Sequence, residues 1–418
     1  MKVEKFNSLF RKLGEFQLRY KVIYLIAISV ITLLCSLGLP KLNLGGNEES
    51  WFSDWDTIKI SQERFEDLFG ANDSVMAFIE ADDVFDPEVL AAIDRLGKRL
   101  ENEVPYAKSV TSLTSLSIPK GTDDGFEILN PLEDFSEKKY SHEEIQKTKD
   151  FILSRDSLVN TLVSDDAKET WLILSLENYS EELSSAMYKI VPPAMEIFNS
   201  EEFKSEKYTI KPAGESYTEY EETLVTKQEL TIRIGFGFLL MVICLVVFVR
   251  SLRGVIVPCI ATIGGICSVL GLSGWINAEG NDEMLALPVL LAMALSIGYA
   301  IHYVNEFRLH FRKTGNRRES VLKSFEESGW PIFFTVVTTA AGLISFLFAD
   351  IQPLRWVGGC SAACVFAVYL YVIVLIPIFL SFGKDNEAQA KEFEQGATKT
   401  DLLMERVGEK ILSGKIII

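Results

Sequence analysis

The chain of 418 residues is long enough for two or three ordinary domains, and its apolar residues (48%) are gathered into blocks rather than spread evenly. The formal net charge of −17 is also segregated, because acidic residues crowd between residues 47 and 229 while basic residues flank the apolar blocks. This distribution predicts a membrane protein whose topology is marked by charge, and it gives no reason to expect a nucleic-acid partner.

The N-terminal residues 1–21 are predicted to form a cytoplasmic amphipathic segment, helical over 4–20, that suits the surface of a bilayer. Residues 22–39 follow as the first predicted membrane span (TM1). A cleaved signal peptide is the competing interpretation. The apolar run is longer than a usual signal-peptide core, and no A-x-A cleavage site follows it, so we favour an uncleaved anchor.

Residues 40–230 are polar and acidic and are predicted to form an α/β domain of the split β-α-β type. A strand–helix–strand pattern occurs twice, around an insertion at 117–166 that holds a short helix near 142–153. The predicted strands are 74–80, 107–113, 170–176 and 208–211, and the predicted helices are 87–103, which Asp86 caps ahead of Pro87, and 180–199.

Three aromatic residues, Trp51, Phe52 and Trp55, lie just beyond the first predicted span. They are typical of the aromatic belt at a membrane surface, which we favour, although they also suit a substrate entrance.

Residues 231–383 are predicted to form five further spans, TM2 to TM6, each long enough to cross a bilayer core of about 30 Å. The spans are 232–249, 255–276, 284–305, 331–349 and 356–382. Residues 1–21, 250–253, 308–323 and the segment from 384 onward are rich in Lys and Arg, so the positive-inside rule places both termini in the cytoplasm. Residues 40–230 are then extracytoplasmic.

Small and polar residues mark three of these spans. In TM3 the residues Gly264, Gly265, Gly271 and Gly274 predict close helix packing. In TM5 the residues Thr335, Thr338 and Thr339 either line a polar path or bond back to their own helix. The middle of TM4 is small and polar, and it leads into Gly298, Tyr299, His302 and Tyr303.

The tail suggests an internal repeat, because residues 403–418 can be aligned with residues 9–24. Gly408 then falls on Gly14, and Glu409 falls on Glu15. We expect residues 384–418 to be a cytoplasmic linker and the start of a second repeat, which would make the chain the first half of a two-repeat transporter. A complete half-size protein is the alternative.

Motifs for catalysis do not stand out in the sequence. It has no G-x-x-x-x-G-K-[ST] run and no H-E-x-x-H, and its six cysteines all lie in apolar blocks without an accompanying His or acid. We therefore expect no catalytic residues, no metal site, no cofactor and no enzymatic activity.

The order of one span, a large outside α/β domain and five spans resembles one half of the resistance-nodulation-division (RND) superfamily. Within it the chain is most similar to the MMPL-type exporters of lipids and hydrophobic molecules. The stretch Gly298–Tyr303 (GYAIHY) resembles that family's G-x-G-x-D-Y-A-I-H run, and 329–342 resembles its segment leading through TM5. The resemblance implies a porter-like outside domain and, by analogy, partners across a periplasm.

The sequence departs from the family at the position that matters for energy coupling. The family's intramembrane Asp, which is implied to carry protons, falls on Gly298. His302 is the titratable residue that remains near it, although relatives that keep the Asp also have this His. Tyr299 is a further candidate, as a hydrogen-bonding group toward the other half.

Two functions follow. The first is an RND/MMPL-type half-transporter in the cell (inner) membrane that exports a lipid or other hydrophobic substrate, with proton coupling doubtful in this half. Its partners would be the lipid bilayer, the substrate, and a second repeat half or another copy. The alternative is a non-transporting, sterol-sensing-like membrane scaffold that binds lipid.

Overall fold

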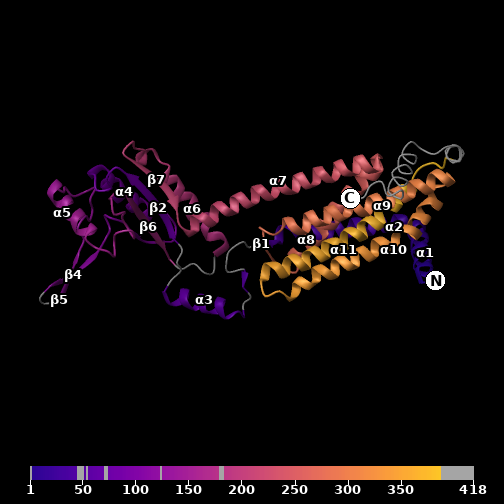
Figure 1. Cartoon of the computed structure of the whole chain (residues 1–418), viewed down its shortest axis with the longest axis horizontal. Coiled ribbons are helices and arrows are strands. Elements are labelled where there is room, and N and C mark those ends of the chain that lie inside the picture. The colour runs from indigo at the N-terminus through magenta and orange to yellow at the C-terminus, as the bar shows by residue number, and fades with distance from the viewer. Residues whose placement is uncertain are drawn as a thin grey trace, which may run out of the picture. The chain divides into compact units, whose positions relative to one another are not determined.

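The structure is a computed structural model that describes residues 2–44, 51–52, 55–69, 74–122, 125–177 and 183–386. The chain divides into two compact units (Figure 1). Unit 1 comprises residues 1–46 and 228–418, and unit 2 comprises residues 47–227. The proposed second-repeat segment 403–418 lies outside the described residues.

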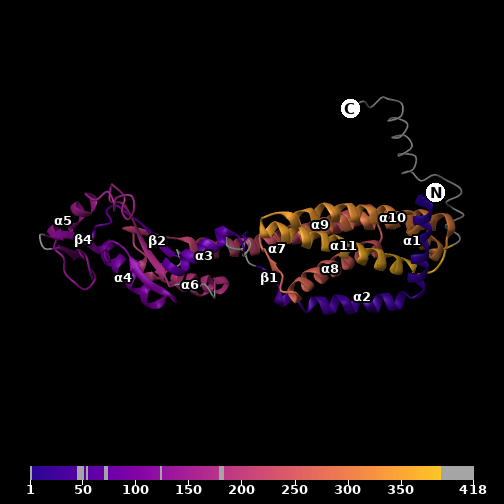
Figure 2. The same ribbon diagram turned by 90° about the horizontal axis from the view of Figure 1, so that it is seen from below.

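Unit 1 is a bundle of long helices that run side by side (Figures 1 and 2). Six helices in the described part of the chain are long and apolar enough to cross a membrane, which agrees with the six predicted spans. These are α2 (Lys21–Ser36), α7 (Glu215–Val249), α8 (Leu252–Trp275), α9 (Ala286–Thr314), α10 (Arg317–Ile344) and α11 (Gln352–Ser381). The amphipathic segment forms helix α1 (Lys2–Arg19), which crosses the end of α2 (Figure 2).

From the sequence, residues 308–330 are expected to form a basic loop between TM4 and TM5. This prediction is wrong, because nearly all of these residues are helical. Helix α9 continues to Thr314 and α10 already begins at Arg317. Gly315 makes the turn with φ 65°, a left-handed conformation that suits glycine at a helix C-terminus. Asn316 then caps α10 by accepting a hydrogen bond of 2.9 Å from the Glu319 N–H. Hydropathy identifies only the apolar part of a helix. The charged turns of the same helix that continue into water do not raise the hydropathy, so the sequence pattern misses them.

Helices α8 and α11 form the centre of the bundle. In their most apolar stretches 61% and 67% of residues are buried, against 6% in α2 and 11% in α10. The predicted close packing of α8 is confirmed. A Cβ on Gly271 would overlap the carbonyl group of Cys35 in α2, and a Cβ on Gly265 would lie 3.0 Å from the Val368 backbone in α11.

Unit 2 contains a four-stranded antiparallel sheet in the order β3-β6-β2-β7. Its strands are β2 (Ser74–Ala81), β3 (Ala107–Thr111), β6 (Glu169–Leu176) and β7 (Tyr208–Ala213), and its helices are α4 (Pro87–Glu103) and α6 (Leu183–Phe198). Helix α4 connects β2 to β3 across the intervening β6, and α6 connects β6 to β7 across β2, which is the split β-α-β connection expected from the sequence. Asp86 caps α4 through the Glu88 N–H at 2.8 Å, as predicted.

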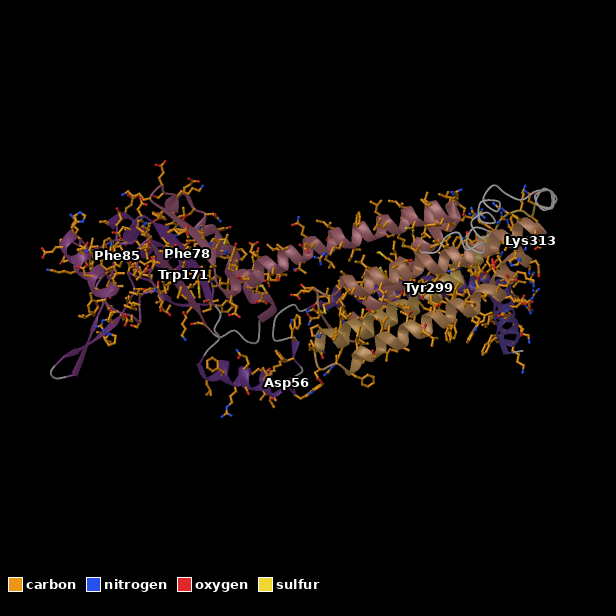
Figure 3. The ribbon with its side chains drawn as sticks, in the orientation of Figure 1. Asp56, Phe78, Phe85, Trp171, Tyr299 and Lys313 are labelled. Atoms are coloured by element: carbon orange, nitrogen blue, oxygen red, sulfur yellow. The ribbon has the colours of Figure 1, made fainter. Side chains whose placement is uncertain are left out.

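The sheet of unit 2 has one buried face and one open face, as alternation along a strand requires. Val75, Ala77 and Ile79 of β2 pack into the core of unit 2 with α4 and α6. On the other face Phe78 and Trp171, which are register partners, have ring centroids 4.7 Å apart and are half-buried (Figure 3).

The remaining elements are short. In unit 2 they are α3 (Thr57–Phe69), the hairpin β4 (Ile118–Thr122) with β5 (Gly125–Leu129), and α5 (His142–Leu153), which confirms the predicted short helix. In unit 1 the strands β1 (Asn43–Leu44) and β8 (Glu279–Gly280) pair in parallel. Of the three predicted belt aromatics, Phe52 and Trp55 are exposed and Trp51 is half-buried.

Candidate functional site

The middle of α9 carries the residues singled out in the sequence, and the structure divides them between two faces of the helix. Tyr299 and Tyr303, one turn apart, are 3% and 1% exposed and point into the bundle. Gly298 is half-exposed and His302 is exposed on the other side. The four residues therefore do not converge on one point, although Tyr299 lies well inside the bundle (Figure 3).

Gly298 lies at an open position. A Cβ added to it would have no other group within 4 Å, so packing in the described part of the chain does not require glycine here. The resemblance drawn from the sequence implies that this position holds a proton-carrying Asp in the family. The structure therefore has room for a larger side chain at position 298, where this chain has glycine.

Tyr299 has a hydroxyl group without a hydrogen-bond partner among the described residues, although it is buried. Its ring meets Tyr369 of α11 edge to face, with centroids 6.3 Å apart and planes at 87°. A buried hydroxyl that lacks a partner costs about 1–3 kcal/mol. Tyr299 is therefore one of the buried polar groups of unit 1, with Asn281 and Trp356, that have unused capacity to bind a ligand or a partner.

Tyr303 serves a structural role by contrast. Its hydroxyl donates to the backbone carbonyl of Val321 at 3.0 Å, and its ring packs edge to face on Phe325 at 5.7 Å. Both partners belong to α10. Tyr303 thus fastens α9 to α10 near the turn that joins them.

The threonines of TM5 lie on α10, where Thr335 and Thr338 are exposed and Thr339 is half-buried. Thr335 donates to the carbonyl of Pro331 at 3.0 Å, and Thr338 donates to the carbonyl of Phe334 at 3.0 Å. These two hydroxyls bond back to their own helix, which is the simpler of the two expected arrangements. Their remaining acceptor capacity faces outward from the bundle.

Hydroxyl groups also join helices in contacts that were not predicted from the sequence. Thr262 of α8 and Ser296 of α9 are both fully buried, with their hydroxyl oxygens 2.5 Å apart. The Tyr371 hydroxyl of α11 lies 2.6 Å from both Thr32 of α2 and Ser268 of α8. The residue types were visible in the sequence, but their pairing depends on how each helix is rotated.

A shallow groove in unit 1 runs along α2 and is lined by Ile23, Ile26, Ala27, Val30 and Ile31. Its lining is almost wholly apolar and open to the surroundings. Such a surface on a membrane helix suits hydrocarbon chains rather than a polar substrate.

Two comparisons with known proteins give matches over most of the chain. The model of the MMPL family matches residues 56–396, which include most of unit 2 and the helices from α7 to α11. A protein of Methanocaldococcus jannaschii, named "Putative membrane protein MJ1562", is 19% identical over 399 residues. The alignment covers 91% of this chain and 95% of that protein.

Proposed function

We propose that this chain, which belongs to the MMPL family, exports a lipid or another hydrophobic molecule across the cell (inner) membrane. The observation that carries the proposal is the order of elements along the chain, most of which falls within one family match. A single membrane helix, a separate α/β unit and five further membrane helices follow one another, and the match extends from residue 56 to residue 396. A porter-like role for unit 2 fits this order.

The orientation we propose has both termini in the cytoplasm and residues 40–230 outside. It is supported by the basic residues gathered at one end of the bundle, where Figure 3 labels Lys313. Arg308 of α9 donates to the carbonyl of Arg250 at the end of α7 at 3.1 Å, and Arg317 of α10 donates to the carbonyl of Leu380 in α11 at 3.2 Å. These bonds gather the basic turns at the same end.

We propose transport without a proton relay in this half of the transport unit. The middle of each apolar span lacks a carboxylate in the sequence, and Gly298 leaves the relay position open. His302 faces outward from the bundle. It could carry protons in place of the missing Asp only if a partner covered it.

We propose that such a partner exists, either as a second repeat half or as another copy of the chain. His302 of α9 and Thr335 and Thr338 of α10 are polar and exposed on helices that cross the membrane. Exposed polar groups at membrane depth are usually buried against protein or line a water-filled cavity. A second bundle on this surface would supply that cover.

A specific observation favours one alternative, a lipid-binding scaffold that does not transport. Gly298 replaces the acid that would drive export in the family, while the apolar groove on α2 and the aromatic pair on the open sheet face remain suited to hydrophobic ligands. Neither export nor scaffolding is an enzymatic function. The two differ in whether the protein moves lipid across the membrane.

The deciding experiment places the full-length protein in vesicles that carry a fluorescent lipid in one leaflet. Export predicts protein-dependent lipid movement above that in protein-free vesicles. Lipid binding without movement would establish the scaffold function instead, and neither binding nor movement would overturn both proposals.

A second arm of the experiment tests coupling with an ionophore and with the variant Gly298→Asp. In the native protein, transport should not change when the ionophore dissipates the proton gradient. The Gly298→Asp carboxylate fits the open space, and transport by that variant should become sensitive to the gradient. A native transport rate that already falls with the ionophore would contradict the absence of a relay.

A further inference from the structure

The hairpin formed by α9 and α10 carries a cluster of side chains of the types that can bind metal ions. Glu306 and His310 lie one helical turn apart on α9, and Glu327 comes from α10. Their ligand atoms all lie within 4.8 Å of one another. The Nε2 atom of His310 is 3.0 Å from a carboxylate oxygen of Glu327.

The nearby basic residues Arg11 and Lys323 form their ion pairs with other carboxylates. Arg11 of α1 forms ion pairs with Glu319 at 3.0 Å and Glu326 at 3.1 Å, and Lys323 pairs with Glu326 at 3.4 Å. The carboxylates of Glu306 and Glu327 meet each other and His310 instead. Lys313 acts on Glu306, and Lys323 acts on Glu327, as a charge in its vicinity.

Two carboxylates this close repel each other unless a cation or a shared proton lies between them. We propose that Glu306, His310 and Glu327 bind one divalent transition-metal ion. One imidazole and two carboxylates are ligands that Zn²⁺ accepts, and three protein ligands leave a fourth position for water. Zn–N and Zn–O bonds of about 2.0–2.2 Å bring ligand atoms to within about 4.4 Å of one another, so small side-chain rotations complete the site.

The partial exposure of the cluster suits an ion that enters from solvent. The His310 side chain is 13% exposed and the Glu327 side chain is 43% exposed. Bound there, the ion would tie α9 to α10 in addition to the Tyr303–Val321 hydrogen bond and the Gly315 turn. This inference concerns the α9–α10 hairpin and does not depend on which molecule the protein exports.

The test uses the full-length protein in detergent, stripped of metal with a chelator and then titrated with Zn²⁺ by calorimetry. We expect one ion per chain. His310→Ala and Glu327→Gln should each weaken binding at least about tenfold, since even indirect support of a metal ligand is worth 10–100-fold. Glu326→Gln is the matched control, because Glu326 neighbours Glu327 but pairs with Arg11 and Lys323, and it should bind as the native protein does.

Co²⁺ in place of Zn²⁺ distinguishes this site from the six cysteines. A cobalt spectrum without a thiolate charge-transfer band is expected, and its visible bands should disappear in His310→Ala. The proposal is overturned if no ion binds stoichiometrically, if Glu327→Gln binds as tightly as Glu326→Gln, or if the spectrum shows thiolate ligands. A cooperative thermal unfolding transition of each metal-free variant shows that the variant folds. If His310→Ala or Glu327→Gln does not fold, the variant Glu306→Gln takes its place.

Discussion

Tyr371 and Tyr299 are both buried tyrosines of the helical bundle, but their hydroxyl groups differ in what they bind. Tyr371 bridges Thr32 and Ser268, which also donate to the carbonyls of Ile28 at 2.8 Å and Gly264 at 2.7 Å. The hydroxyl groups of Tyr371, Thr32 and Ser268 have three protons in total, and they make four contacts. One of the four contacts is therefore left without a proton at any time. The Tyr299 hydroxyl has no partner in the described part of the chain.

Removal of these two hydroxyls should therefore have opposite consequences for stability. Tyr371→Phe should lower the free energy of unfolding by about 0.5–1.5 kcal/mol, because it leaves α2, α8 and α11 without their shared hydrogen bonds. Tyr299→Phe should leave stability unchanged or raise it. Chemical denaturation of both variants in the same detergent checks this, and a larger loss in Tyr299→Phe would show that its hydroxyl is already bonded within the chain.

At the scale of the elements, the glycines of α8 determine how closely its neighbours approach. Gly271→Ala should destabilise the bundle by about 1–3 kcal/mol, because its Cβ overlaps the carbonyl group of Cys35 and forces α2 away. Gly235→Ala on α7 is the control, since a Cβ there meets nothing within 4 Å. The midpoint of thermal unfolding in detergent should fall only for Gly271→Ala, and equal midpoints would contradict the close packing of α2 on α8.

Helix α5 of unit 2 gives a prediction for pH. Ser141 and Glu144 form a capping box, in which hydrogen bonds from the Ser141 N–H and then its hydroxyl hold the pKa of Glu144 below its ordinary value of 4.5. A carboxyl group whose pKa is lowered by folding stabilises the helix above its unfolded pKa, and the effect is lost as the pH falls through the folded pKa.

Glu144→Ala should accordingly speed hydrogen exchange of the α5 amides at pH 7, whereas at a pH below both pKa values the variant and the native protein should exchange alike. Glu143→Ala is the matched control, because in the part of the chain that the structure describes Glu143 pairs only with Lys147, at 2.8 Å. Equal acceleration by the two variants at pH 7 would count against the capping box.

The sequence predicted the types of the elements better than their ends. Six spans and the strand–helix order of unit 2 could be read from apolar runs and alternation, because burial in lipid or in a sheet imposes those patterns. The ends of the helices could not be read from the sequence, because charged helical turns outside a bilayer have no hydropathy signal. Examples are the start of α7 at Glu215 and the helices that continue up to either side of Gly315. Glu306 and His310 showed a one-turn spacing, but Glu327 joins them only through the packing of α10.

At the scale of the whole molecule, the bundle of unit 1 has a well-covered centre and sparsely covered outer helices. The most apolar stretches of α2, α7 and α10 are only 6%, 17% and 11% buried. Lipid covers apolar side chains at no cost, but Thr335, Thr338 and His302 are polar and exposed as well. The surface of α9 and α10 is thus better suited to protein than the surface of α7.

This difference predicts that the full-length protein assembles through α10. Gly342 of α10 is exposed with open space at its Cβ, so Gly342→Trp should block a second copy without disturbing the fold. Gly235→Trp on α7 is equally open and should leave the assembly intact. Native mass spectrometry should find two chains together in the native protein and in Gly235→Trp, but one chain in Gly342→Trp. If the native protein is a single chain in membranes as well as in detergent, or if Gly342→Trp still forms pairs, the polar surface of α10 must be covered by something other than a second copy.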